Sequence, residues 1–213
     1  MRHDGDERTI HRLEAFSDIV MGFCLAEIGL RLVVPATPAA FAASLPNLGA
    51  FAITFLFIAV LWWLHHKLFV TYFVLRPLTV GLNFVLLGTL ALAVYFQSVF
   101  ATFVLSNQSL VLPTRLWMAA LALVYATLTA LYGISIALRF DELNPEDLRW
   151  GVMRAFRGGV LAVSFGVVGA FAYSGEHALA YAGFATVVLL GIVRRIVVPR
   201  LTERLLARRE RPS

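Results

Sequence analysis

The sequence predicts an all-α integral membrane protein, with six transmembrane helices in one bundle and both termini in the cytoplasm. Three observations predict this fold: the composition, the spacing of the apolar segments, and the distribution of lysine and arginine. Of the 213 residues, 60% are hydrophobic and only 15% are charged, whereas soluble domains are usually about 45–50% apolar and about 25% charged. The mean hydropathy of +0.80 agrees with a chain that lies largely in lipid.

Six apolar segments are long enough, or nearly so, to cross a bilayer, because a spanning helix needs about 20 residues. They form one predicted transmembrane domain over residues 1–199, followed by a basic cytoplasmic tail over 200–213. The sixth segment is short before Arg194 and Arg195 interrupt it, but these side chains can extend to the interface. The predicted helices cover about residues 13–34, 48–64, 78–104, 116–138, 155–173 and 178–198.

The connections between these segments contain turn and boundary signals. The stretch "PATPAAFAASLPN" after the first helix carries Pro35, Pro38 and Pro46. After the fourth helix, Asn144-Pro145 predicts a turn, and the acidic residues that follow indicate that Asn144 caps a short amphipathic lead into the fifth helix.

Lysine and arginine fall almost entirely on one side of the predicted membrane. With both termini inside, sixteen of the eighteen cationic residues are cytoplasmic, and only Arg31 and Arg115 are outside. This asymmetry supports six spans with both termini in the cytoplasm, and we expect a multi-pass protein of the inner cell membrane. We expect the basic tail to be a solvated helix that touches anionic lipid, and we expect no nucleic-acid partner.

Polar side chains of the first three helices gather at one depth, near the predicted inner interface. Indole and imidazole N–H groups are donors that a buried carboxylate needs, so we expect a shared hydrogen-bond network. We favour a structural role for it, because polar groups hold helices together in lipid without chemistry. The predicted members are Ser17, Asp18, Trp62, one histidine of the pair His65 and His66, and Asn83.

Glu27 is an acid in the middle of the first apolar segment. It lies on one helical stripe with Phe23 and Leu30, and it precedes Arg31 by four residues, the spacing of an intrahelical ion pair. Two interpretations stay open. Arg31 neutralises Glu27, or the stripe faces water along a symmetry axis, where a ring of glutamates attracts cations.

An enzyme is not expected. Adjacent histidines such as His65 and His66 point about 100° apart on a helix and poorly share one metal. The sequence contains neither a zinc-protease H-E-x-x-H motif nor a phosphate-binding G-x-x-x-x-G-K-[ST] motif. We therefore expect no catalytic residue, no metal site and no cofactor. Cys24 is the single cysteine, so no intrachain disulfide can form.

The segment "RLEAFSD", from Arg12 to Asp18, has the form R-x-x-x-F-S-D. At the start of the first of six apolar spans, this motif resembles the signature of the transmembrane-protein-175 family of potassium channels, which is known from lysosomes and from bacteria. "WWLHHKLF" resembles the W-x-x-H-H-x-x-F end of the family's second helix, and Asn83 matches an asparagine early in the third. The hydropathy fits a bacterial member with one six-helix unit per subunit.

The resemblance implies a homotetramer in which the first helix of each subunit lines a central pore. The motif residues Arg12, Phe16, Ser17 and Asp18 then brace this helix against the second and third helices. The implied pore constriction is a stripe of bulky aliphatic residues, which falls here on Phe23, Glu27 and Leu30.

The sequence departs from the family pattern at several positions. Ala26 occupies the position of a threonine, and Tyr95-Phe96 replaces a proline-phenylalanine pair near the end of the third helix. Two gate positions carry Phe23 and Glu27 in place of aliphatic residues. An apolar gate closes by dewetting, so a glutamate in that ring either wets the gate or requires a different closure.

The leading functional hypothesis is a passive, tetrameric cation channel, nominally for potassium, whose only small-molecule ligand is the permeant K⁺ or another monovalent cation. The expected partners are copies of the chain itself and membrane lipid. Two alternatives are a proton pathway through Glu27 and a non-conducting membrane scaffold in which Glu27–Arg31 pairs seal the axis.

Overall fold

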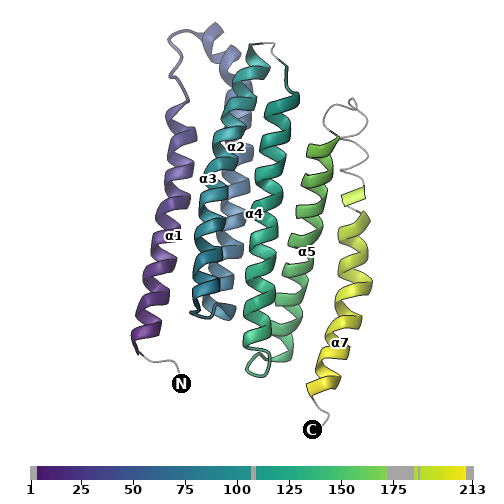
Figure 1. Ribbon diagram of the computed structural model, residues 1–213. Helices are drawn as coiled ribbons and strands as arrows, with labels where there is room; N and C mark the ends of the chain where they lie inside the picture. Colours follow the sequence, from purple (N-terminus) through teal and green to yellow (C-terminus); the bar gives the residue numbers. More distant parts are fainter. Residues whose placement is uncertain (1–3, 107–108, 172–184, 187, 210–213) are drawn as a thin grey trace.

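The computed structural model describes residues 4–106, 109–171, 185–186 and 188–209, and these residues form an all-α bundle (Figure 1). The first five helices run roughly side by side, and α7 lies along α5. The helices are α1 (Asp4–Leu30), α2 (Pro38–Lys67), α3 (Pro77–Leu105), α4 (Val111–Leu138), α5 (Pro145–Ala170) and α7 (Val198–Arg209), with π-helical turns η1 (Leu68–Tyr72) and η2 (Val193–Val197).

One end of the bundle gathers the start of α1, the α2–α3 and α4–α5 junctions, and the end of α7 (Figure 1). Arg31, which follows α1, and Arg115, in the first turns of α4, belong to the opposite end. The strongly basic segments of the chain therefore share one end of the molecule.

The second helix begins ten residues before the predicted start at 48, because the proline-rich stretch opens it. Thr37 is the N-cap, and its hydroxyl accepts a hydrogen bond from the Ala40 N–H at 3.1 Å. Pro38 occupies the first helical position, where the missing N–H costs nothing. Pro46 lies within the helix, a position that membrane helices tolerate better than soluble ones.

The fifth helix also begins earlier than the predicted start at 155. Asn144 caps it, since its side-chain oxygen accepts a hydrogen bond from the Asp147 N–H at 2.7 Å. The segment expected as a short amphipathic lead is thus continuous with the apolar part of α5.

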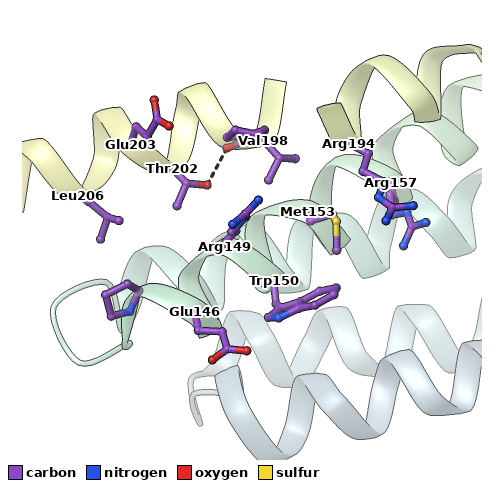
Figure 2. Close-up of a pocket in the computed structure, with 12 residues that line it drawn as sticks. Glu146, Arg149, Trp150, Met153, Arg157, Arg194, Val198, Thr202, Glu203 and Leu206 are labelled. Carbon is purple, nitrogen blue, oxygen red and sulfur yellow. Dashed lines mark hydrogen bonds between the residues drawn. The ribbon is translucent and has the colours of Figure 1, made fainter. Parts of the chain in front are cut away.

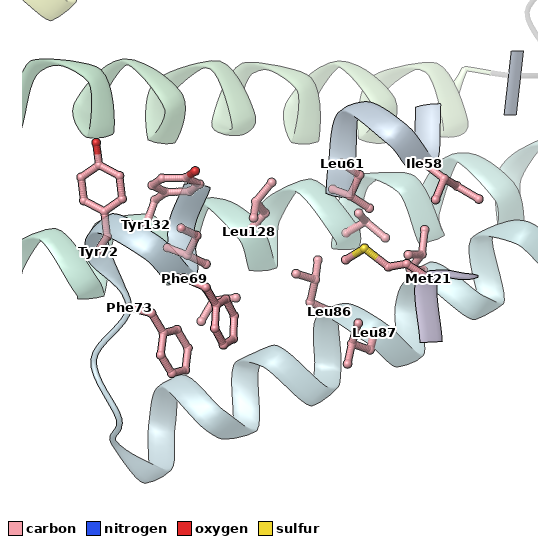
Figure 3. Packing of buried hydrophobic residues seen from close by; sticks show 14 of the residues in the cluster. Met21, Ile58, Leu61, Phe69, Tyr72, Phe73, Leu86, Leu87, Leu128 and Tyr132 are labelled. Carbon is pink, nitrogen blue, oxygen red and sulfur yellow. The ribbon is translucent and has the colours of Figure 1, made fainter. Parts of the chain in front are cut away.

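The core lies between α1, α2, α3 and α4 and continues to α5 (Figure 3). Two tyrosines anchor it through their hydroxyl groups: Tyr132 donates to the Leu64 carbonyl at 2.6 Å, and Tyr72 donates to the Asp147 carbonyl at 2.8 Å. Gly151 allows α5 to approach, because a Cβ there would lie 2.7 Å from a ring carbon of Tyr72.

Four of the described helical segments are long and apolar enough to cross a membrane, so the protein is a multi-pass membrane protein. They are Pro38–Tyr72, Pro77–Val104, Val111–Leu138 and Pro145–Ala170. The first predicted span is not among them, because α1 carries Glu14, Asp18 and Glu27 in its apolar part.

The sixth predicted span, 178–198, lies partly outside the described residues, which omit 172–184 and 187. Residues 185–186 and 188–192 are helical, and the helical run continues through Arg194 and Arg195 in η2 into α7. The two arginines therefore do not end the helix. The first part of the predicted tail, as far as Arg209, is helical.

Candidate functional site

The first helix has two faces with different environments. One face is buried against the bundle, and its residues recur at helical spacing: Ile10, Ser17, Met21, Cys24 and Ile28. The opposite face is open in the single chain and carries large apolar side chains, namely Phe16, Ile19, Phe23 and Leu30. Phe23 is 69% exposed and Leu30 is 87% exposed. We call this second set, together with Glu27, the open face of α1.

A fully buried hydrogen-bond chain joins α1, α3 and α2. The Asn83 amide of α3 donates to the Ser17 hydroxyl of α1 at 3.1 Å, and its oxygen lies 2.8 Å from Nε2 of His65 on α2. Ser17 in turn donates to the Leu13 carbonyl at 2.8 Å. Because the Asn83 side-chain oxygen is an acceptor, His65 donates through Nε2. This hydrogen-bond chain fixes the rotation of α1 about its own axis.

His65 is held by packing as well as by hydrogen bonding. Its ring lies 4.5 Å from the Phe69 ring, measured between centroids. The Nδ1 atom of His65 is buried and has no hydrogen-bond partner among the described residues. His65 is thus a buried residue that contacts Asn83 on α3 and Phe69 one turn further along its own helical segment.

A second, more exposed layer of contacts lies beside this chain, also between α1 and α2. The Trp62 indole donates to the Asp18 carboxylate at 2.8 Å, and Nδ1 of His66 lies 2.9 Å from the Glu14 carboxylate. Trp62 stacks on His66 at 5.6 Å with an interplanar angle of 12°. Glu14 and Asp18 of α1 therefore each have a donor on α2.

The two adjacent histidines contact different partners, as expected from their angular separation on the helix. His65 points to Asn83 and His66 points to Glu14. Sequence reasoning did not identify Glu14, although it precedes Asp18 by four residues and so lies on the same face of α1. This four-residue spacing between Glu14 and Asp18 was the sequence signal that could have identified Glu14.

Two motif residues lie outside both layers. Phe16 is on the open face and packs edge-on against Phe84 of α3 with ring centroids 5.9 Å apart. Arg12 is exposed, and within the described residues its side chain forms no hydrogen bond or ion pair. The structure therefore does not bring Arg12 into the predicted network.

Glu27 and Arg31 form an ion pair on the open face of α1. The Arg31 guanidinium lies 2.9 Å from the Glu27 carboxylate, and the two side chains are 50% and 45% exposed. Such an exposed pair contributes only about 0–1 kcal/mol in water. The two interpretations of Glu27 are thus compatible in the single chain, because the pair exists and also faces outward with Phe23 and Leu30.

Residues 12–93 match the family model of the endosomal/lysosomal potassium channel TMEM175, a region that runs from Arg12 in α1 into α3. The fold is similar to a crystal structure of a variant of the potassium channel MtTMEM175 bound to a nanobody fusion protein, with a TM-score of 0.66 and 21% sequence identity. That likeness covers 91% of this chain and 93% of the other. No curated protein matches the chain. The family resemblance recognised in the sequence is confirmed.

Proposed function

We propose that this chain, whose residues 12–93 match the TMEM175 family model, is one subunit of a homotetrameric cation channel, nominally for potassium. In this proposal each subunit crosses the inner cell membrane six times with both termini in the cytoplasm. Helix α1 of each subunit lines the pore, and cations move passively down their electrochemical gradient.

The open face of α1 is the observation that carries this proposal. A helix that is packed on one face and open on the other presents a surface that the single chain does not cover. This surface includes Glu27, and a charged side chain that faces lipid inside the hydrocarbon core costs free energy, up to about 2.5–3.5 kcal/mol at the centre of the bilayer. Placing the open face along a water-filled axis between subunits removes that cost.

The buried hydrogen-bond chain supports the same arrangement. Ser17, Asn83 and His65 join α1 to α3 and α2, so they fix which residues of α1 face outward. In the proposal they are scaffold residues together with Phe16, Asp18, Trp62 and His66. The pore-lining residues are Phe23, Glu27 and Leu30.

The ion pair supports two further candidate functions. A Glu27 ring that is neutralised by Arg31 attracts cations weakly, so the axis is either sealed or open to protons alone. In the first case the protein is a membrane scaffold, and in the second Glu27 carries protons. Whether the Glu27–Arg31 pair stays intact in the assembled protein distinguishes these functions from a potassium channel.

Flux through purified protein in liposomes tests these alternatives. Separate K⁺, Na⁺ and H⁺ gradients are applied to the wild type, to Glu27→Gln and to a matched control, Glu142→Gln. Glu142 is a suitable control because it also forms an exposed ion pair at 2.9 Å, with Arg139, but lies between α4 and α5.

If the protein is a potassium channel, we expect K⁺ flux in the wild type and in Glu142→Gln, and a changed K⁺ flux in Glu27→Gln. Proton flux alone, lost in Glu27→Gln, would replace it by the proton pathway. Absence of flux in every gradient, from protein that is folded and assembled, would leave the scaffold.

A further inference from the structure

A cleft of about 820 Å³ lies between the start of α5 and the η2–α7 segment, away from the open face of α1 (Figure 2). We propose that this cleft binds the phosphate headgroup of an anionic membrane lipid. The proposal requires only that the protein lies in a membrane, and it is independent of ion conduction.

Three arginines line the cleft from two different elements. Arg149 and Arg157 belong to α5, and Arg194 belongs to η2. Figure 2 shows Arg149 between α5 and α7, with Arg157 and Arg194 both toward the other end of the cleft. Within the described residues, none of the three forms an ion pair or a side-chain hydrogen bond. Guanidinium groups bind phosphate oxygens with well-matched geometry.

The two acids of the cleft form no ion pair with these arginines. Glu146 and Glu203 are among the lining residues, but neither is paired with an arginine of the cleft. In Figure 2, Glu203 points away from α5. The neighbouring Arg195, Arg200 and Arg204 add further positive charge on the same segment. Like charges gathered in one cleft repel each other, and a bound anion relieves that repulsion.

The apolar part of the cleft favours a lipid over free phosphate. Trp150, Met153, Val198 and Leu206 line it beside the arginines, and Trp150 is half-exposed. A phospholipid offers a phosphate and an acyl chain together, whereas inorganic phosphate has nothing to contact these side chains. Tryptophan is also enriched at the depth of lipid headgroups, and cytoplasmic clusters of arginine attract anionic lipids.

The position of Trp150 in the wall of the cleft provides a direct probe. The full-length protein is reconstituted in phosphatidylcholine vesicles that contain brominated phosphatidylglycerol or brominated phosphatidylcholine, and tryptophan quenching is measured. Subtracting the signal of Trp150→Phe isolates Trp150 from the other three tryptophans. The test variant is Arg149→Gln/Arg157→Gln/Arg194→Gln. The matched control is Arg195→Gln/Arg200→Gln/Arg204→Gln, which removes the same charge from residues that do not line the cleft.

We expect brominated phosphatidylglycerol to quench Trp150 at lower mole fraction than brominated phosphatidylcholine. The cleft variant should lose more of this preference than the roughly fivefold per arginine that general surface charge contributes, whereas the control variant should lose no more than that. Equal loss in both variants would overturn the proposal, since the attraction would then come from the general charge of the segment. Absence of any preference for brominated phosphatidylglycerol, together with a change of the Trp150 fluorescence on adding millimolar inorganic phosphate at constant ionic strength, would show that the site takes free phosphate rather than lipid.

Discussion

The Asn83 amide of α3 lies 3.1 Å from the Ser17 hydroxyl of α1, although 66 residues separate them in the chain. Both side chains are fully buried. The Asn83 oxygen meets His65 at the same time, so this one amide connects three helices. This buried polar contact therefore fixes the rotational orientation of α1, which lies at the edge of the bundle with one face open.

Replacing Ser17 by alanine should therefore destabilise the protein. The Asn83 amide loses its acceptor in a buried site, which costs about 1–3 kcal/mol, and the thermal unfolding midpoint in detergent should fall. Ser44→Ala is the matched control, because the Ser44 hydroxyl also donates to a backbone carbonyl but, within the described residues, forms no hydrogen bond to another helix. Equal midpoints for the two variants would contradict the role of the Ser17–Asn83 contact.

Trp62 and Trp63 provide a second matched pair. Trp62→Phe removes the indole donor to Asp18, and the loss of a hydrogen bond to a charged group should cost roughly 1.5 kcal/mol or less at this partly exposed site. Trp63→Phe keeps the ring and removes no contact to α1. We expect the first substitution alone to increase the susceptibility of α1 to limited proteolysis. If Trp63→Phe has the same effect, the Asp18 contact is not what secures α1.

The polarity of the open face gives a prediction about ion preference. Arg31→Gln leaves Glu27 without its partner, so a pore lined by α1 should favour cations over anions more strongly than the wild type does. The reversal potential in a salt gradient should move toward the cation equilibrium potential. Arg115→Gln is the control for net charge, because Arg115 also belongs to this end of the bundle. A shift of the same size in both variants would indicate a surface-charge effect and would contradict the placement of Arg31 at the pore.

Much of this arrangement follows from sequence patterns, and the missing parts have physical reasons. Ser17, His65 and Asn83 can be predicted to meet because they lie at the same depth in apolar helices. Depth in the membrane does not distinguish the buried hydrogen-bond chain from the exposed layer of Asp18 and Trp62. Which side chains are buried depends on how each helix is rotated.

The predicted helix boundaries were inaccurate where local sequence rules compete with each other. Proline-rich sequence suggested a loop before residue 48, but Thr37 followed by Pro38 is also the pattern of a capped helix start, and the structure shows that it opens α2. The cleft with Arg149 and Arg194 could not be predicted, because it exists only through the packing of α7 along α5.

The close approach of α5 to the core depends on Gly151. A Cβ at this position would lie 2.7 Å from a ring carbon of Tyr72 and 2.8 Å from the end of the Ile136 side chain. The Tyr72 hydroxyl is tied to the Asp147 carbonyl, so its ring cannot move freely. Gly151→Ala should therefore destabilise the protein by about 1–3 kcal/mol through overpacking.

Gly133→Ala is the matched control for Gly151→Ala, because Gly133 lies inside α4 and has nothing within 4 Å of an added Cβ. There alanine should stabilise the helix by roughly 0.5–1 kcal/mol. The two unfolding midpoints should thus move in opposite directions. A midpoint for Gly151→Ala at or above that of the wild type would show that α5 does not pack against Tyr72 as closely as described.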